Sequence, residues 1–277
     1  EIPYKNGEAT GLAKFYNEQT GKLEYETNAI NGLRNGLSKE YYPSGKVANE
    51  VNFKNDIEDG ITKIYYESGK LKGEATYKNG QLDGLAKIYD ENGKLVEQAT
   101  YKNGKTDGIQ KEYYENGQIK MESLAKNNKK NGIGRSYSIT GVLIAEIPFK
   151  DDEVDGTIKT YNEVTGKLET EGEFKNGKAE GTTKEYYPNG KVAIEEKYQN
   201  DLREGLSKSY YENGVLKEER FYKNDKLQGI SKIYYPNGKL QIEASFKEDK
   251  LDGISKEYDE TGKIIDQTTF KDNKQIN

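Results

Sequence analysis

The side chains of this sequence that could carry out chemistry are carboxylates and tyrosines, because the chain has no histidine and no cysteine. That composition excludes the usual general base, the catalytic triads and imidazole or thiolate metal ligands. Paired carboxylates could still act as acid and base, since 48 acidic residues are present. The glutamates, however, recur in nearly every copy of a repeated pattern, whereas a catalytic pair should be unique. We therefore expect no enzyme, no cofactor and no metal site.

Two acidic clusters, at 55–60 and 151–156, resemble half of a calcium-binding loop. A complete loop of that kind needs a further glutamate at its twelfth position, on a following helix. Here the pattern that follows is that of a strand. Asp, Asn and Gly are also the residues that tight turns require. Hairpin turns are therefore the interpretation that we prefer for these clusters.

A glycine recurs at a fixed spacing and divides the chain into eleven similar copies. Neighbouring glycines are 24 residues apart, or 25 for the first and seventh copies. These opening glycines are Gly11, Gly36, Gly60, Gly84, Gly108, Gly132, Gly156, Gly181, Gly205, Gly229 and Gly253. A fixed period of this size is typical of an array of stacked repeats.

Each copy reads as two short strands joined by glycine turns. Residues 37–41 and 230–234 alternate apolar and polar side chains and are rich in Tyr and Ile, which predicts a strand. A turn such as Glu91-Asn92-Gly93 follows, and the second strand ends on Phe or Tyr in most copies. The sequence predicts an all-β fold: a single-layer antiparallel β-meander, or solenoid, of about eleven 24-residue β-hairpin repeats, elongated and twisted.

Three columns of side chains recur along this array. A tyrosine lies five residues after each opening glycine, a cation lies two residues before that tyrosine, and an acid or its amide lies in the second strand. The spacing places cation and ring on one face, where lysine stems can pack between rings and meet the glutamates. This predicted structural ladder includes Lys39, Lys63, Lys87, Lys111, Tyr41, Tyr65, Tyr89, Tyr113, Glu50, Glu74 and Glu122. Exposed pairs contribute only about 0.2–1 kcal/mol each, so their repetition would matter more than any single pair.

Six copies carry a second tyrosine directly after the first, and it should face the opposite side of the sheet. These residues are Tyr42, Tyr66, Tyr114, Tyr187, Tyr211 and Tyr235. Flat amphipathic rings suit contacts with protein, peptide or glycan, so we predict that these six residues bind a partner. The alternative is that they stack along the sheet.

Composition limits the class of partner. Charged residues make up 33% of the chain, yet the formal net charge is only -5, because 43 basic residues nearly balance 48 acidic ones, and the two kinds alternate. No basic stripe is left for nucleic acid, and clustered cations for an anionic membrane surface are also missing. We expect no nucleic acid partner and regard a membrane surface as a poor fit. No apolar run approaches the ~20 residues of a membrane helix.

The chain reads as one continuous repeat array over 1–277, with a weak joint near 125–150. The copy at Gly132 is the most degenerate, and Pro148 lies within a strand, where it removes a ladder donor. Both chain ends are open strands, which predicts end-to-end self-association.

The start of the sequence bears on location. It begins at Glu1 in the middle of a repeat, and its only methionine is Met121, so we expect that an upstream segment was removed by signal cleavage or by trimming. The absence of cysteine fits an exported bacterial protein. We expect a protein that is secreted or on the cell surface of a bacterium; a cytoplasmic protein is the alternative.

The repeated signature is Gly-(Leu/Ile)-x-Lys-x-Tyr-Tyr-x-x-Gly-Lys-(Leu/Val), followed by Glu, then Phe or Tyr, Lys-Asn-Gly and another Gly. It resembles the bacterial variant of the MORN repeat, found in proteins often labelled YwqK-type antitoxins, and the resemblance covers essentially the whole chain. It implies an open, curved β-meander with a concave aromatic face. It also implies binding work, as an antitoxin or immunity-like partner or as a surface-exposed scaffold. Eukaryotic relatives of the motif are linked to membrane recruitment and scaffolding.

We therefore expect a non-enzymatic repeat scaffold that binds a macromolecular partner, with affinity summed over several copies. One alternative is an exported bacterial adhesin that binds a host protein or glycan. A second is a structural spacer without a specific ligand, and a third is an enzyme that uses carboxylates.

Overall fold

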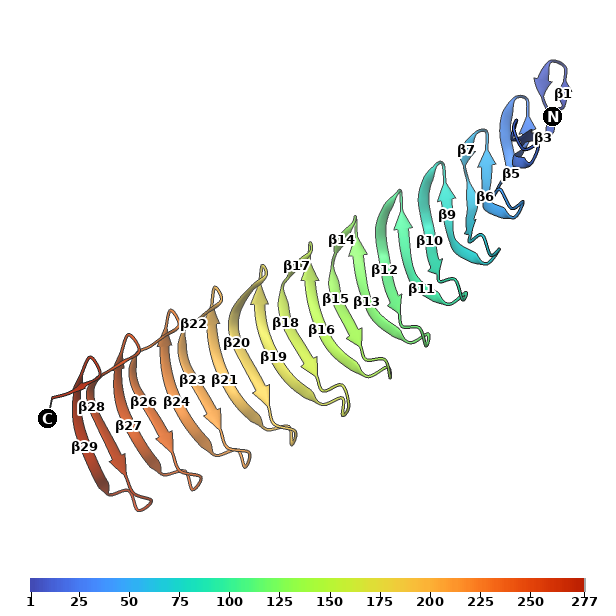
Figure 1. Cartoon of the computed structure of the whole chain (residues 1–277). Helices are drawn as coiled ribbons and strands as arrows, with labels where there is room; N and C mark the ends of the chain where they lie inside the picture. The colour runs from blue at the N-terminus through green and yellow to red at the C-terminus, as the bar shows by residue number, and fades with distance from the viewer. Residues whose placement is uncertain (277) are drawn as a thin grey trace. The chain divides into compact units, whose positions relative to one another are not determined.

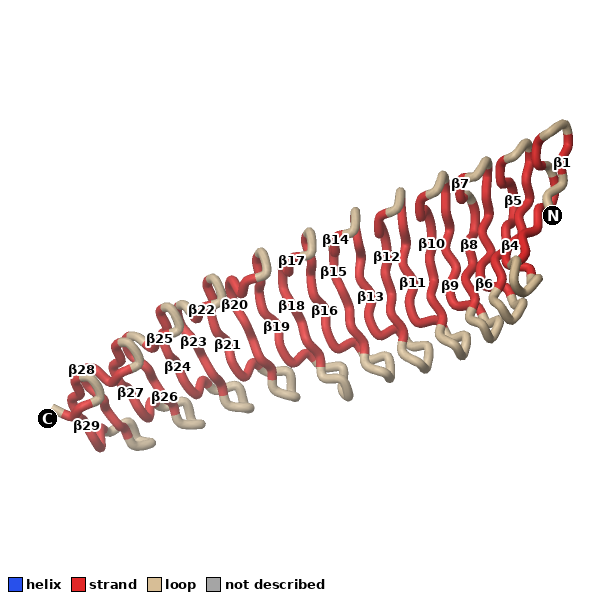
Figure 2. Tube along the Cα trace, turned by 45° about the horizontal axis from the view of Figure 1, so that its top comes forward, coloured by secondary structure: helices blue, strands red, loops and turns tan. Residues whose placement is uncertain are grey.

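A computed structural model of the chain describes residues 1–276, and the regular secondary structure of these residues is β-strand throughout. The chain divides into two compact units. Unit 1 comprises Glu1–Gly132 and Ser136–Gly141, and unit 2 comprises Ile133–Arg135 and Val142–Asn277. The boundary lies within residues 125–150, the stretch that the sequence marks as a joint. Within each unit the strands lie side by side in chain order (Figure 1), and their turns gather along two edges (Figure 2).

The first fourteen strands belong to unit 1. They are β1 (Tyr4–Lys5), β2 (Glu8–Ala9), β3 (Gly11–Tyr16), β4 (Leu23–Ile30), β5 (Leu33–Tyr41), β6 (Val47–Lys54), β7 (Ile57–Glu58), β8 (Gly60–Tyr65), β9 (Leu71–Lys78), β10 (Gln81–Tyr89), β11 (Leu95–Lys102), β12 (Lys105–Tyr113), β13 (Ile119–Lys126) and β14 (Lys129–Lys130).

The short strand β15 (Gly132–Tyr137) contains residues of both units, and the remaining strands belong to unit 2. They are β16 (Leu143–Lys150), β17 (Glu153–Val154), β18 (Gly156–Tyr161), β19 (Leu168–Lys175), β20 (Lys178–Tyr186), β21 (Val192–Gln199), β22 (Leu202–Arg203), β23 (Gly205–Tyr210), β24 (Leu216–Lys223), β25 (Lys226–Leu227), β26 (Gly229–Tyr234), β27 (Leu240–Lys247), β28 (Lys250–Tyr258), β29 (Ile264–Lys271) and β30 (Lys274–Gln275).

Strand pairing within each unit follows the chain. In unit 1, β9 pairs with β10, β10 with β11 and β11 with β12, all antiparallel. In several copies the first strand is interrupted just before the opening glycine, so that β6 pairs with both β7 and β8. The predicted all-β antiparallel meander of hairpin repeats is confirmed. The strand β16 runs through Pro148 without a break.

The opening glycine lies inside the first strand of its copy, at a bulge. Between Leu82 and Ala86 of β10 the register advances four residues, while β9 advances only from Tyr77 to Ala75. At this bulge Gly84 has φ +134°, and a Cβ there would lie 2.9 Å from the Cβ of Thr76. Only glycine satisfies both the backbone angle and the close approach of the neighbouring strand. The same residue that sets the repeat period therefore also bends the strand.

The turn between copies is of type I′, and the hairpin turns predicted at 55–60 and 151–156 are of this kind. In one such turn Asn79 and Gly80 have φ +50° and +78°. The amide of Gly80 donates to the carbonyl of Glu58, in the short strand β7 after the preceding turn, at 2.8 Å, so a main-chain hydrogen bond connects each turn to the copy before it. Where aspartate replaces glycine, as at Asp225, its Oδ1 accepts a further bond from the amide of Arg203 at 2.9 Å.

The buried side chains are small, with the exception of Tyr222. The hydrophobic ones are Ala13, Ala29, Ala48, Ala99, Ala125, Tyr222 and Ala244, and the polar ones are Thr27, Ser38, Ser138 and Ser231. A single sheet has no second layer against which to bury large apolar side chains. Hydrogen bonds between neighbouring copies must therefore carry much of the stability of each unit.

Candidate functional site

Strand alternation gives the sheet of each unit two faces. The ladder face carries the cation, first-tyrosine and glutamate columns. The groove face carries the residue between the cation and the first tyrosine, together with the small residue before the cation; in β8 these are Ile64 and Thr62. The two faces therefore differ in chemistry, and we describe each in turn.

On the ladder face several glutamates link neighbouring copies. Lys39 lies opposite Glu50 in register, with 3.3 Å between Nζ and Oε1, and Tyr65 of the next copy donates its hydroxyl to Glu50 at 2.7 Å. Glu74 accepts from Lys87 and Tyr89 at 3.1 and 3.2 Å. Further members show the same contacts: Tyr41 to Glu26 at 2.7 Å, Lys111 to Glu122 at 3.3 Å and Tyr137 to Glu122 at 2.9 Å.

Two members of the predicted ladder lack these contacts within the described residues. Lys63 forms no hydrogen bond or ion pair, although its charge helps to lower the pKa of Glu50. Tyr113 forms no hydroxyl bond either, and the copy before it has Gln98 in place of the acid. The ladder is therefore interrupted at these two residues.

Electrostatics on this face favour a structural role. Burial raises the pKa of Tyr65 to about 12, and the hydrogen bond to Glu50 and its charge act in the same direction. Burial also raises the pKa of Glu50, but hydrogen bonds from Tyr65 and Lys39 outweigh it, and the net pKa lies below the ordinary value. At neutral pH the phenol keeps its proton and the carboxylate stays ionised. Neither group is tuned for proton transfer.

The second tyrosines, which the sequence predicts as partner-binding residues, join neighbouring copies. Each is half-buried, and each hydroxyl donates to the main-chain carbonyl of the first tyrosine in the next copy. The donor–acceptor distances are 2.6 Å for Tyr42, 2.8 Å for Tyr66, 2.9 Å for Tyr114, 2.7 Å for Tyr187, 2.7 Å for Tyr211 and 2.8 Å for Tyr235. Their hydroxyls are thus occupied by the chain itself. Partner binding by the exposed parts of these rings stays a prediction.

Copies without a second tyrosine use the position differently. Asp90 accepts hydrogen bonds from the amides of Asn92 and Lys94, each at 2.8 Å. These contacts hold the pKa of Asp90 below its ordinary value, with the bond from Lys94 as the largest cause. The side chain directly after the first tyrosine therefore forms a hydrogen bond either to the next copy, when it is a tyrosine, or to the turn of its own copy, when it is an aspartate such as Asp90.

The groove face of unit 1 contains an apolar pocket of about 150 Å³. Ile64 and Ile88 both lie opposite Gly73 in register, so no side chain separates them. The rest of the lining consists of Thr62, Glu74, Ala75, Tyr77, Ala86 and Lys87. Ile64 and Ile88 remain 45% and 48% exposed. Two large apolar side chains thus face solvent across a gap that a glycine leaves open.

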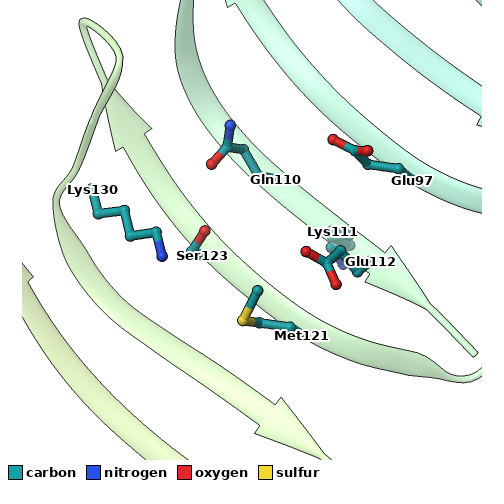
Figure 3. A pocket seen from close by; sticks show the side chains of 7 residues that line it. All are labelled: Glu97, Gln110, Lys111, Glu112, Met121, Ser123 and Lys130. Atoms are coloured by element: carbon teal, nitrogen blue, oxygen red, sulfur yellow. The ribbon is translucent and has the colours of Figure 1, made fainter. Parts of the chain in front are cut away.

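A polar pocket of about 140 Å³ adjoins this region of unit 1 (Figure 3). Glu97 lies opposite Glu112 in register, and Glu112 lies opposite Met121. Like charges directly opposite one another in a sheet are destabilising. Lys120 approaches Glu112 at 3.6 Å, whereas Glu97 has no ion-pair partner in the described part of the chain. Acidic side chains therefore border the apolar pocket.

In unit 2 the groove face contains a larger apolar pocket, of about 230 Å³. Its lining residues are Glu218, Arg220, Leu227, Ser231, Ile233, Ile242, Ala244 and Phe246. Ile233 and Ile242 lie opposite each other, flanked by Glu218 on one side and Glu257 on the other.

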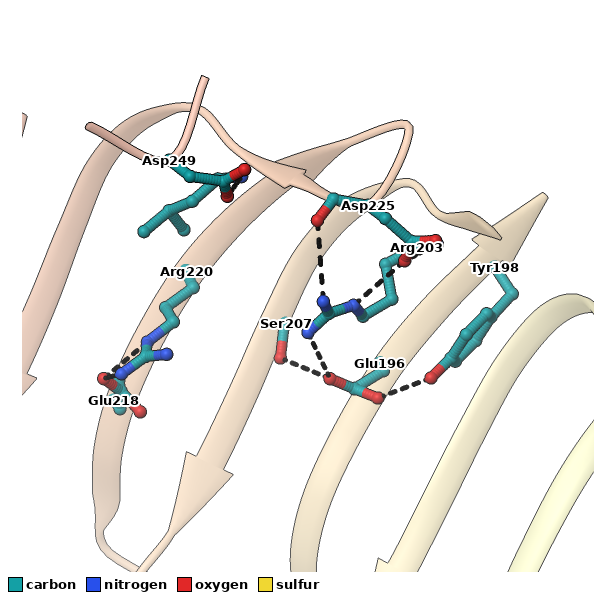
Figure 4. A network of polar contacts seen from close by, with 9 residues as sticks. Glu196, Tyr198, Arg203, Ser207, Glu218, Arg220, Asp225 and Asp249 are labelled. Atoms are coloured by element: carbon teal, nitrogen blue, oxygen red, sulfur yellow. Dashed lines mark hydrogen bonds and ion pairs between the residues drawn. The ribbon is translucent and has the colours of Figure 1, made fainter. Parts of the chain in front are cut away.

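A network of polar contacts holds the groove face of unit 2 beside this pocket (Figure 4). Glu196 accepts from Tyr198 at 2.8 Å and from Ser207 at 3.4 Å. Arg203 pairs with Asp225 at 3.1 Å, and its guanidinium lies over the ring of Tyr222 at 4.0 Å. Since every member has a partner within the chain, this network fixes side chains rather than offering free groups to a ligand.

Across residues 1–276, no group of three or more acidic side chains is arranged so that it could hold a metal ion. The same residues contain no helix that is long and apolar enough to cross a membrane.

The repeats themselves decide the family. The family model described as the MORN repeat variant matches residues 34–55, 58–79, 82–103, 106–127, 179–200, 203–224, 227–248 and 251–272, which is more than half of the chain. The chain belongs to the MORN repeat variant family. Residues 128–178, which include the degenerate copy, lie outside the match. No curated protein matches this MORN repeat variant chain.

Solved structures that resemble it are much longer chains. The alignment covers 95% of this chain and 17% of a chain in the crystal structure of TcdB2–TccC3, at 14% identity and a TM-score of 0.21. For a variant of the Photorhabdus luminescens Tc holotoxin pore the values are 96%, 15%, 12% and 0.19. The MORN repeat variant chain thus spans about a fifth or less of these chains, and we draw no functional conclusion from them.

The groove face is the part of the site that sequence reasoning missed. The sequence feature that could have indicated it is the variable position between the cation and the first tyrosine of each copy. This position is Ile64, Ile88 and Ile233 in some copies and an acid in others. The constant Lys and Tyr on either side of this position indicate only the ladder face, where the side chains form hydrogen bonds and ion pairs with one another.

Proposed function

We propose that this chain is a non-enzymatic scaffold that binds a protein partner on the groove face of its sheet. Repeats of this family often serve protein or membrane interactions. The observation that carries the proposal is the pair Ile64 and Ile88, two half-exposed apolar side chains that face each other across a pocket above Gly73. Apolar anchors in pockets provide most of the energy of protein interfaces.

A protein fits this face better than a membrane does. The unpaired carboxylate of Glu97 lies next to Ile88 in register, and anionic lipid would be repelled there. A protein can supply both an apolar side chain for the pocket and a donor or cation for the carboxylate. An antitoxin or immunity-like protein and a surface-exposed scaffold would both use such a binding face. The identity of the captured protein distinguishes these two roles.

The test compares two faces of the same two copies. Ile61 and Leu85 lie on the ladder face and are 49% and 39% exposed, close to the values for Ile64 and Ile88. The purified chain would be used as bait against extracts of cells that produce it, with Ile64→Glu/Ile88→Glu and Ile61→Glu/Leu85→Glu as matched variants. We expect the first variant to lose the captured protein and the second to retain it, with circular dichroism verifying that both are folded. Retention by both, or loss by the ladder-face variant alone, would contradict the proposal.

A further inference from the structure

The apolar pocket of unit 2 has an asymmetric border. On one side Glu218 is neutralised by Arg220, whose Nη2 lies 2.6 Å from Glu218 Oε1. On the other side Glu257 lies opposite Asp266, and neither carboxylate has an ion-pair partner among the described residues. Asp266 accepts only a hydrogen bond from Thr268, at 3.2 Å. One flank of the pocket is therefore balanced in charge and the other carries two uncompensated carboxylates.

The pocket also contains an unsatisfied hydroxyl. Ser231 is only 7% exposed, lines the pocket, and its Oγ has no hydrogen-bond partner in the described part of the chain. The corresponding residue of the unit 1 pocket, before the cation of β8, is Thr62, whose Oγ1 likewise has no hydrogen-bond partner among the described residues. A buried hydroxyl without a partner is unfavourable, and a polar atom brought by an occupant would remove that cost.

The size of the pocket fits one bulky side chain. Its volume of about 230 Å³ exceeds the ~150 Å³ of an engineered cavity that accommodates benzene. Ile233, Ile242 and Phe246 provide apolar walls. Beyond Ile242, Glu257 lies one strand and Asp266 two strands along the sheet, roughly 5 and 10 Å away at ordinary strand spacing. In an extended peptide, a bulky side chain in the pocket and a long basic side chain two residues later can reach the pocket and the carboxylates at the same time.

We propose that the unit 2 pocket receives a bulky apolar side chain of a protein partner, and that Glu257 and Asp266 bind a lysine or arginine two residues away in the same segment. The proposal rests on the proposed function and names the chemistry of the segment recognised. Charge complementarity selects this occupant, since a cation between the two carboxylates relieves a like-charge pair that the chain itself leaves unbalanced.

The test uses defined peptides and does not need the natural partner. Acetylated, amidated pentapeptides with the sequences Gly-Phe-Gly-Lys-Gly, Gly-Phe-Gly-Glu-Gly and Gly-Gly-Gly-Lys-Gly would be titrated into the full chain labelled at isoleucine methyl groups. We expect the first peptide to shift the methyl signals of Ile233 and Ile242 and to bind about fivefold or more tightly than the other two. The methyls of Ile230 and Ile254, on the ladder face of the same unit, should not move.

Two variants complete the test. In Glu257→Gln/Asp266→Asn the preference for lysine over glutamate in the peptide should disappear, while shifts caused by phenylalanine remain. In Ile233→Ser the shifts caused by phenylalanine should disappear at Ile242. Equal binding of the lysine and glutamate peptides to the unaltered chain, or shifts confined to Ile230 and Ile254, would overturn the inference. Those outcomes leave the proposed function intact if the Ile64→Glu/Ile88→Glu variant still loses the captured protein. Failure of the inference is therefore distinguishable from failure of the proposed function.

Discussion

The hydroxyl of Tyr66 donates a hydrogen bond to the main-chain carbonyl of Tyr89 at 2.8 Å, and so connects the end of one copy to the same point in the next. Both residues belong to columns that are visible in the sequence, yet the bond joins the second tyrosine of one copy to the first of its neighbour. Five sister contacts repeat this geometry. The second-tyrosine column is therefore part of the stacking of copies.

Replacing Tyr66 by phenylalanine should lower the free energy of unfolding by about 1 kcal/mol, because it removes this hydrogen bond and keeps the ring. Urea denaturation followed by circular dichroism measures the change. Protein capture by the groove face should be unaffected. If Tyr66→Phe instead keeps full stability and loses the captured protein, the second tyrosines act in partner binding, as the sequence suggests.

Gly84→Ala should be among the most destabilising single-methyl changes in unit 1. A Cβ would lie 2.9 Å from the Cβ of Thr76 and φ is +134°, so strain of about 1–3 kcal/mol adds to a steric clash. Gly93, with φ +86° and no atom within 4 Å of its Cβ position, is the matched control. Gly93→Ala should lose about 1–2 kcal/mol from the left-handed backbone alone. Equal losses in the two variants would show that the bulge tolerates a side chain.

Asp225→Ala and Asp225→Gly separate two roles of one turn residue. Asp225 has φ +66° and its carboxylate accepts bonds from the amide and the guanidinium of Arg203 at 2.9 and 3.1 Å. Alanine loses these bonds and is strained at this angle, so we expect the larger fall in melting temperature. Glycine loses the bonds but suits the angle, as in copies with Asn-Gly, so its melting temperature should fall less. Thermal denaturation of both variants against the unaltered chain tests the order.

Ser231→Ala should raise the free energy of unfolding by about 1 kcal/mol, since it removes a buried hydroxyl that has no partner. Ser207 supplies the control, because its Oγ donates to Glu196 at 3.4 Å. Ser207→Ala should be neutral or destabilising. A loss of stability in Ser231→Ala would mean that the hydroxyl is satisfied in the free protein.

Alkaline pH should weaken both units through the ladder tyrosines. Burial, the largest cause, and hydrogen bonds to glutamates raise the pKa of Tyr41, Tyr65, Tyr186 and Tyr234 to about 12, from 10.0. Because the folded state holds these protons more tightly, their contribution is complete below about pH 10 and is lost as the pH rises towards about 12. Urea midpoints measured from pH 8 upward, together with tyrosinate absorbance, test this. Tyr65→Phe should reduce the loss between those limits, and an unchanged midpoint up to pH 12 would contradict it.

The sequence by itself determined the repeat, the strands and the ladder face. Glycine at a 24-residue spacing, turn residues with positive φ and strict alternation are local signals, and each unit follows them. Contacts such as that between Lys39 and Glu50 follow from alternation plus antiparallel pairing, so they could be foreseen without coordinates.

Only the tertiary structure decided what the register brings together. That Ile64 and Ile88 meet across Gly73 depends on which residues of three strands lie opposite one another, and a bulge in every copy shifts that register. The same holds for the bond from Tyr66 to the carbonyl of Tyr89, whose acceptor is a main-chain atom that carries no sequence signal. The sequence gives the identity of each side chain, whereas bulges and the stacking of copies determine which residues lie opposite one another on neighbouring strands. The ladder face was therefore predictable from the sequence, and the groove face was not.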